Sequence, residues 1–502
     1  MFRQVVRGVH TGRRGSVPVV CVLLLASFAF VSAPPDTARP ESPEPHSPPL
    51  SQSLAERLER EVTETAAFRH LRAFQRTADR HGGNRGPGTP GYSASADYVR
   101  DRLSEAGYHV RFQEFTFPDF VQTRETAVSS APDRRRELHP YMARFSPSTP
   151  AGGLRAELTV VPGQGCAPEE YEAAGARGRI ALVRGEECSL TDKQRAAAQA
   201  GVRLLLMNIG APGSGMNLRH RMKPPEAGVI PSASLSRGES EQLAADAAGG
   251  RTVTLRVVLR GKHVRTRSFN VLADTPTGRA DRTVVLGAHL DSVPEGPGID
   301  DNASSAAMVL ETALRLAPHA GQVRNRVRFA WWGAEERGMV GSQHYVDQLS
   351  AEERDAIALN LNFETIGAPN YARMVYDGDD SDGTGAGPGP PGSAAIEEEF
   401  TRYFARRGLP TVGLDFDGRS DFGPFIEAGI PAGGGSGGYN HVKTPEWQRL
   451  FGGRAGQYLD PCYHQTCDTT GNIDRTLFGQ FGDAMAYVTG RFARDLSGVG
   501  RW

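Results

Sequence analysis

The chain has 502 residues, of which 39% are apolar, so it can bury a sizeable core and form one to three domains. Lys and Arg together number 57 and Asp and Glu 58, for a formal net charge of −1. This balance excludes the basic surface of a nucleic-acid-binding protein and of a protein drawn to an anionic membrane.

The first 33 residues have the pattern of an export signal. Four arginines precede an apolar run over 17–31, namely Arg3, Arg7, Arg13 and Arg14. The run is shorter than the roughly 20 residues that span a bilayer, and small residues near 29–33 are typical of a cleavage site. We therefore predict a secreted protein with no stable membrane association after cleavage. The Arg13–Arg14 pair leaves a twin-arginine route open, and an uncleaved N-terminal anchor is the alternative.

Residues 34–52 are rich in Pro, Ser and Glu and are predicted to be a linker. Apolar residues at helical spacing over 53–79 predict one or two helices, and a further amphipathic helix is expected over 92–106. The stretch 109–117 alternates and predicts a strand. Residues 53–134 are therefore assigned to the first part of the main domain.

From 135 to 262 the pattern changes to short alternating runs separated by Gly-rich turns. Strands are expected near 158–161, 180–183, 204–207 and 253–259, with one helix over 191–200. This texture indicates a small β-rich domain inserted between two parts of a larger one.

The remaining residues, 263–502, return to the larger domain. Apolar strands are predicted over 282–288 and 326–332, each followed by a helix, over 304–316 and from about 342. Alternation of strand and helix indicates an α/β fold with a mostly parallel sheet, in which the chemistry lies beyond the carboxyl ends of the strands. Residues 377–392, rich in Gly, Asp and Pro, are predicted to be a surface excursion.

Four of the five cysteines remain after removal of the export segment, which contains Cys21. An even number is expected for an exported protein with disulfides. The pairs Cys462–Cys467 and Cys166–Cys188 are the simplest of three possible connectivities. A zinc knuckle is the competing interpretation, but neither pair has the CxxC spacing.

Ionisable side chains follow several predicted strands. His289, Asp291 and Asp301 come after the strand at 282–288, Glu335 and Glu336 after the strand at 326–332, and Glu364 after 358–363; His464 lies near the C-terminus. Each residue alone is more often structural, as a satisfied histidine, a solvated pair or a helix cap. Together they would place several carboxylates and two imidazoles on one rim. Their repulsion and their mixed N and O donors indicate a divalent metal, with zinc the best match.

Five segments in this order and spacing resemble a known family. They are GAHLDSVPEGPGIDDNASSAA, WWGAEERGMVGS, LNFETIGAPN, GRSDFGPFIEAGIPAGG and DPCYHQTCDTTGNI. They resemble the M28 co-catalytic zinc aminopeptidases, and look most like the secreted Streptomyces members. The insert resembles a protease-associated (PA) domain. The resemblance implies a three-layer αβα fold with a mixed, mostly parallel central sheet, and two Zn²⁺ ions per chain.

The resemblance also implies the ligand set. His289 and Glu364 would bind one zinc, Glu336 and His464 the other, and Asp301 would bridge both; neighbouring Asp300 is the alternative bridge. Asp291 would accept the imidazole N–H of His289 and fix its tautomer. A cis peptide between Asp301 and Asn302 is expected by the same resemblance.

The implied reaction is hydrolysis of the first peptide bond of substrates with a free N-terminus. Glu335 would be the general base, its side chain pointing away from that of Glu336 on an extended segment. Tyr463 would stabilise the oxyanion, and Arg419 would help to organise the substrate's amino terminus.

Two positions depart from the family pattern. Glu364 stands where Asp is common, which adds a methylene to a ligand that also helps to bind the free amine. Ser436 stands near an aromatic of the apolar pocket, so the preferred N-terminal residue is open. The alternatives are an M28-like carboxypeptidase or dipeptidase, in which Arg419 would bind a terminal carboxylate, and a metal-free binding ectodomain. The insert is expected to be a lid or spacer, with a docking module as the other interpretation.

Overall fold

The computed structural model describes residues 53–499 apart from 132–133, 185–187, 209–227 and 250. The predicted export segment and linker therefore lie outside the described residues. Among the helices that the structure describes, none is both long and apolar enough to cross a bilayer.

The larger domain is built on a mixed sheet whose centre is parallel. Its order is β13-β12-β14-β11-β9-β10-β8, with β1 on the far edge of β8. The four neighbours β14, β11, β9 and β10 run parallel, whereas β12 pairs antiparallel with β14 and β8 antiparallel with β10. The bounds are β8 Thr254–Asp274, β9 Arg279–His289, β10 Asn325–Trp332, β11 Ile357–Glu364, β12 Met374–Tyr376, β13 Val412–Leu414 and β14 Ala432–Ser436. The predicted strands at 282–288, 326–332 and 358–363 are confirmed.

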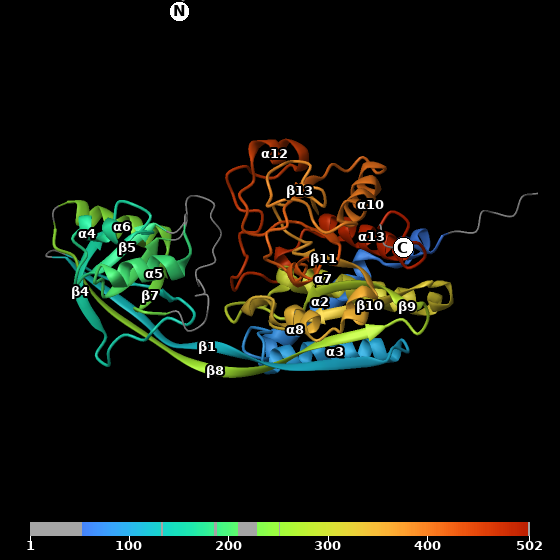
Figure 1. The fold of residues 1–502 in the computed structure, drawn as a ribbon, viewed down its shortest axis with the longest axis horizontal. Coiled ribbons are helices and arrows are strands. Elements are labelled where there is room, and N and C mark those ends of the chain that lie inside the picture. The colour runs from blue at the N-terminus through green and yellow to red at the C-terminus, as the bar shows by residue number, and fades with distance from the viewer. Residues whose placement is uncertain (1–52, 132–133, 185–187, 209–227, 250, 500–502) are drawn as a thin grey trace, which may run out of the picture. The chain divides into compact units, whose positions relative to one another are not determined.

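Helices cover both faces of this sheet, as the three-layer prediction requires (Figure 1). Alternate residues of β9 face opposite ways, with Val284 and Leu286 in the larger core and Val285 in a smaller one. Helices α1 Leu54–Glu61, α2 Glu64–Arg80, α3 Pro90–Glu105, α7 Ser305–Leu316, α10 Ser393–Ala405 and α13 Arg475–Phe492 supply the larger core. Helices α8 Val340–Asp347 and α11 Gly423–Glu427 pack on the other face.

The first three helices begin directly after a Ser or Thr residue that caps them. Ser53, Thr63 and Thr89 cap α1, α2 and α3, each accepting a backbone N–H three residues on. The remaining helices are α4 Pro168–Ala173, α5 Leu190–Gln199, α6 Arg237–Ala248, α9 Ala351–Asp355 and α12 Pro445–Phe451. The predicted helices at 53–79, 92–106, 191–200 and 304–316 are therefore confirmed.

The insert has its own apolar core, and its strands continue the sheet through the antiparallel pairing of β4 with β8. Strands β4 Leu154–Val160, β5 Ile180–Arg184, β6 Leu204–Asn208 and β7 Ser232–Leu235 run parallel, with β3 Tyr141–Met142 antiparallel at the edge. The core draws on residues from Phe120 to Leu259, including Leu182 and Leu206. The β-rich prediction is confirmed, and α5 is the predicted helix.

Two long strands connect the insert to the larger domain. β1 spans Val110–Ala131 and pairs antiparallel with β8 along its length, from Val110 opposite Ala273 to Ser130 opposite Thr254. We call these paired strands the β1–β8 ribbon (Figure 1). The predicted strand at 109–117 is the first part of β1, and its continuation to Ala131 was not predicted. The short β2, Arg134–Leu138, pairs with the far end of β1.

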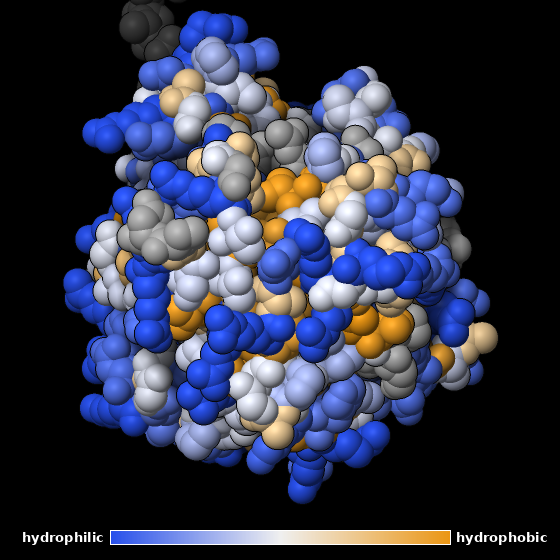
Figure 2. Space-filling view, turned by 90° about the vertical axis from the view of Figure 1, so that its left-hand side faces the viewer, coloured by the Kyte–Doolittle hydropathy of each residue, from blue (hydrophilic) through white to orange (hydrophobic). Residues whose placement is uncertain are grey.

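Both simple cysteine pairs are disulfides, Cys166–Cys188 and Cys462–Cys467, as predicted. Residues 377–392 form no helix or strand between β12 and α10, which agrees with the predicted excursion. On the face drawn in Figure 2, hydrophilic residues predominate and apolar ones gather only in small patches.

Candidate metal centre

The carboxyl ends of the parallel strands bring the predicted ligands together. His289 is the last residue of β9 and Glu364 the last of β11, while the Glu335–Glu336 pair follows β10. In the register of the sheet Trp332 lies opposite His289, so β9 and β10 end at the same level. Asp301 comes from the irregular turn Ile299–Ser304 before α7, where its own backbone angles are not helical, and His464 comes from the segment that carries the Cys462–Cys467 disulfide.

Two groups of donor atoms form around Asp301. One contains His289, Asp301 and Glu364, and the other Asp301, Glu336 and His464, with the donor atoms of each group within 4.8 Å of one another. His289 Nε2 lies 3.2 Å from Asp301 Oδ1 and 3.1 Å from Glu364 Oε1. His464 Nε2 lies 3.0 Å from the other oxygen, Asp301 Oδ2, and 3.2 Å from Glu336 Oε2. Asp301 therefore offers one oxygen to each group.

Asp300, the alternative bridging residue, faces away from both groups. Its Oδ1 accepts the backbone N–H of Gly367 at 2.8 Å. It lies instead near Asp460 and Asp468, and the carboxylate of Asp468 accepts the backbone N–H groups of both Asp300 and Asp301. The peptide between Asp301 and Asn302 is cis, as the resemblance implied.

The donor set fits divalent metal ions. Each group offers one imidazole nitrogen and two carboxylate oxygens, the mixture that zinc accepts. Asp301 Oδ2, Glu336 Oε1 and His464 Nε2 are buried atoms without a hydrogen-bond partner among the residues that the structure describes. Buried polar atoms normally have partners, so these atoms are suited to a bound cation.

The charged side chains of the two donor groups strongly shift one another's pKa values. Burial lowers the pKa of His289, but the carboxylates of Glu364 and Asp301 outweigh burial and raise this pKa well above its ordinary value. Burial also raises the pKa of Glu336, to about 7. Perturbed groups of this kind gather at functional sites.

The carboxylate of Asp291 does not make the predicted hydrogen bond with His289. His289 Nδ1 contacts the main-chain carbonyl of Asp291 at 3.0 Å, whereas the carboxylate oxygen Oδ1 lies 3.8 Å away. The carboxylate instead accepts the backbone N–H groups of Glu335 at 3.1 Å and Glu336 at 3.2 Å. The prediction assumed that β9 continues to Asp291, but the strand ends at His289, and the backbone carbonyl then reaches the imidazole.

The prediction that Glu335 and Glu336 lie on an extended segment is wrong. Glu335–Arg337 form one turn of 3₁₀ helix after Ala334, whose φ is 61°. The turn still separates the two side chains, because Glu336 joins the His464 group and Glu335 Oε2 lies 3.9 Å from His289 Nε2. Burial raises the pKa of Glu335 well above its ordinary value, and the nearby carboxylates of Asp421 and Glu364 add to the rise.

The other predicted site residues flank this centre. The ring of Tyr463 stacks on His464, with 3.9 Å between ring centres. Arg419 is 45% exposed and its guanidinium lies 5.2 Å from the ring of Tyr439, which in turn neighbours Tyr463. Ser436 is fully buried and bonded to Thr365, so it does not line an open pocket.

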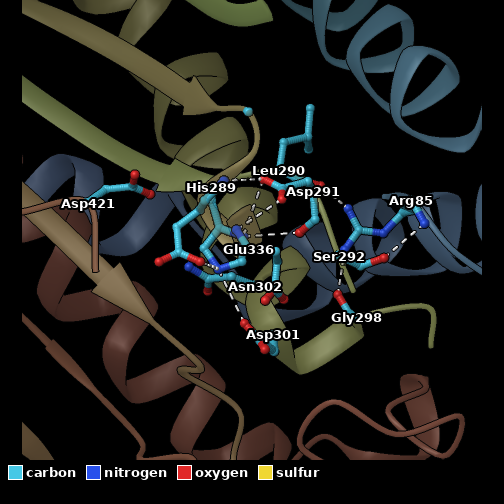
Figure 3. A network of polar contacts seen from close by, with 12 residues as sticks. Arg85, His289, Leu290, Asp291, Ser292, Gly298, Asp301, Asn302, Glu336 and Asp421 are labelled. Atoms are coloured by element: carbon cyan, nitrogen blue, oxygen red, sulfur yellow. Dashed lines mark hydrogen bonds and ion pairs between the residues drawn. The ribbon is translucent and has the colours of Figure 1, made fainter. Parts of the chain in front are cut away.

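Residues that the sequence did not single out support the ligands. Ser420 donates to Glu364 Oε2 at 2.6 Å, and Asn362 donates to Ser420 at 2.8 Å. Asp421, the next residue, is fully buried near His289 (Figure 3) and accepts a hydrogen bond from Ser342. The GRSD segment was noted only for Arg419, and nothing in its pattern marks the two residues that follow.

Arg85 was also missed, although it organises the loop between His289 and Asp301 (Figure 3). It is fully buried, and its guanidinium donates to the main-chain carbonyls of Leu290, Pro297 and Gly298. Burial lowers the pKa of Arg85 to about 10, so the side chain stays charged at neutral pH. It lies in a Gly-rich loop where no periodicity or charge pattern distinguishes it from a surface arginine.

Arg85→Lys is expected to lower the free energy of unfolding by about 3 kcal/mol, because one ammonium cannot reach three carbonyls and each buried group left unpaired costs about 1–3 kcal/mol. Urea unfolding followed by tryptophan fluorescence measures the change. Arg80→Lys, at the exposed end of α2, is the matched control. An unchanged unfolding midpoint in Arg85→Lys would contradict the role given to this guanidinium.

Comparison with known proteins identifies the family. The profile of peptidase family M28 matches residues 270–489, and that of the PA domain matches residues 154–243. A probable lipoprotein aminopeptidase, LpqL, of Mycobacterium tuberculosis is 38% identical over 463 residues, covering 90% of this chain and 89% of its own length. The chain belongs to peptidase family M28.

Other relatives of this M28 peptidase show similar sequence identity and coverage. An aminopeptidase of Pseudomonas aeruginosa is 36% identical, covering 93% of this chain and 89% of that protein. Leucine aminopeptidase 2 of Trichophyton equinum is 36% identical, covering 83% and 81%. Among solved structures, a zinc aminopeptidase from Bacillus subtilis shares the fold with a TM-score of 0.64 and 24% identity, covering 85% of this chain and 94% of that one.

Proposed function

We propose that this M28 peptidase is a secreted two-zinc aminopeptidase that removes N-terminal residues from peptides, with Glu335 as general base. The observation that carries the proposal is Asp301, whose two oxygens face two separate donor groups, with Glu335 beside them. The M28 relatives named above as aminopeptidases support the reaction. The two disulfides and the N-terminal export pattern support secretion.

His289, Asp301 and Glu364 would hold one zinc, and Asp301, Glu336 and His464 the other. Zinc in such a centre polarises the scissile carbonyl and makes an attacking water more acidic. Glu335 takes the proton of that water and passes it to the leaving amine. The phenol of Tyr463 donates to the developing oxyanion, since burial keeps it protonated by raising its pKa.

The carboxylates of the rim also suit a substrate with a free amine. Glu335 and Glu364 are close enough to influence each other's charge, and Asp421 adds a third buried carboxylate. An α-ammonium group next to these side chains would form charge-assisted hydrogen bonds. A terminal carboxylate would be repelled by the same groups, which favours an aminopeptidase over a carboxypeptidase. Arg419 would then help to orient the amino terminus from the exposed side.

The first test is hydrolysis of a panel of Leu-, Met-, Phe- and Lys-p-nitroanilides beside N-acetyl-Leu-p-nitroanilide. The zinc-loaded protein is expected to cleave only the free-amine substrates and to lose that activity on chelation. The relative rates across the panel also show which N-terminal side chain the enzyme prefers. Cleavage of C-terminally free, N-blocked peptides instead of the panel would replace the proposal with a carboxypeptidase.

A further inference from the structure

We propose that the β1–β8 ribbon, together with Arg144 of the insert, holds the Glu335–Glu336 loop in place and so positions the general base and a metal ligand. The kinetic part of this inference rests on the proposed function. It assigns to the insert a role beyond that of a lid or a docking module.

The backbone of the loop is unusual. Ala334, Gly338 and Met339 have φ values of 61°, 99° and 56°, so two non-glycine residues adopt the left-handed conformation within six positions. Side chains with a Cβ rarely adopt it, and such a backbone persists where its surroundings hold it. The surroundings of residues 334–340 therefore determine where the carboxylates of Glu335 and Glu336 lie.

Within the larger domain, side chains bond to the backbone of this loop at its start and at its end, where Ser342 donates to the carbonyl of Met339 at 3.2 Å. The carboxylate of Asp291 accepts the N–H groups of Glu335 and Glu336. The turn is closed internally, with the N–H groups of Gly338 and Met339 donating to the carbonyl of Glu335. None of these backbone contacts involves the side chains of Ala334, Arg337 and Val340.

The ribbon supplies an ion pair to the loop. Arg337 Nε lies 3.3 Å from Asp119 Oδ1, and the two side chains are only 13% and 6% exposed. Asp119 belongs to β1 and is fixed by Thr266 of β8, whose hydroxyl donates to Oδ2 at 3.1 Å. A pair this buried is little screened by solvent, and removal of one partner leaves the other charge uncompensated.

The ribbon also packs against the loop. Phe115 and Phe117 of β1 form one buried apolar cluster with Ala334, and Val340 packs on its edge. Ala334 and Val340 mark the two ends of the left-handed segment. The apolar contacts thus fix its ends while the Asp119–Arg337 pair fixes its middle.

The insert itself adds a contact to the metal ligand. Arg144 follows β3, is 8% exposed, and donates from Nη1 to the main-chain carbonyl of Glu336 at 2.9 Å. The peptide groups of Glu336 are therefore held on both sides, the N–H by Asp291 and the carbonyl by Arg144. Small displacements of a catalytic group are costly, since an error of about 1 Å lowers rates roughly 100-fold.

The test compares Asp119→Asn and Arg144→Met with a matched control, Glu114→Gln. Glu114 also lies on β1 and pairs with Arg267 of β8 at 2.8 Å, but both side chains are largely exposed and neither contacts the loop. We expect kcat of each test variant to fall roughly 10-fold or more, with KM within about twofold. Zinc release into excess chelator, followed with a colorimetric indicator, should be faster in both test variants and unchanged in the control.

Conservative replacement at Arg337 separates positioning from mere support of the fold. Arg337→Lys keeps the charge opposite Asp119 and should retain more of kcat than Arg337→Met at a temperature where both are fully folded. If the wild type cleaves no aminoacyl substrate, the proposed function fails, and the zinc-release comparison still decides this inference. Test variants that match Glu114→Gln in kcat and in zinc release, or that change only thermal stability, would overturn it.

Discussion

Glu335→Gln is expected to lower kcat by about 10²- to 10⁴-fold, the range found for loss of a general base. The amide has the size of the carboxylate but cannot accept the proton of the attacking water. Glu335 lies outside both donor groups, so the variant should keep its full metal content. Steady-state hydrolysis of Leu-p-nitroanilide, with zinc measured by mass spectrometry on the same sample, tests both expectations.

Glu336→Gln is the matched control, one residue along the same turn. Glu336 belongs to the His464 group, so this variant should lose activity together with metal. A Glu335→Gln enzyme that retains more than a tenth of wild-type kcat would remove Glu335 from the role of base. A Glu335→Gln enzyme that loses zinc would instead make it a ligand.

Removal of metal is expected to destabilise the protein and to abolish activity. The two donor groups bury several carboxylates whose repulsion a bound cation relieves. Zinc at 1,000 times its dissociation constant would add about 4 kcal/mol to the free energy of unfolding for one site. Thermal unfolding of the chelated protein, with zinc added back in steps, should show the midpoint rising with zinc concentration.

Metal stoichiometry in two variants separates the sites. Asp301→Asn removes the shared ligand and should reduce binding at both groups, whereas Glu364→Gln touches only the group of His289. We therefore expect about two ions in the wild type, about one in Glu364→Gln and fewer in Asp301→Asn. One ion in the wild type, or two in Asp301→Asn, would contradict a shared centre.

The strands and helices around the site could be predicted because their patterns are local. β9 and β11 are short apolar runs that end in His289 and Glu364, and α1, α2 and α3 start at Ser or Thr caps. The prediction that these side chains meet at Asp301 followed from parallel strands that end at one edge of the sheet, together with the family resemblance. The continuation of β1 past 117 was missed because its residues are mostly polar, and their order depends on pairing with β8.

Contacts made by the backbone were the least predictable part of the site. Arg85, Asp291 and Arg144 all bond to main-chain groups, so their partners carry no side-chain signal in the sequence. The left-handed turn at Ala334 was equally hidden, because neither Ala334 nor Met339 is a residue type that favours this conformation. Such features depend on tertiary surroundings and not on the local pattern.

The register of the two long strands shows how the larger domain can accommodate an inserted domain. Within the ribbon, Val121 lies opposite Lys262 and Gln122 opposite Gly261, and the pairing then shifts before Arg124 meets Arg260. A short turn joining Gln122 to Gly261 would therefore close an ordinary β-hairpin on the host enzyme, with every pairing from Val110 to Gln122 intact. Hairpin tips are where chains accept insertions most readily. The larger domain would then keep Asp119 and the two phenylalanines against the active-site loop whatever domain is inserted at the tip, and only the contact from Arg144 would depend on the insert.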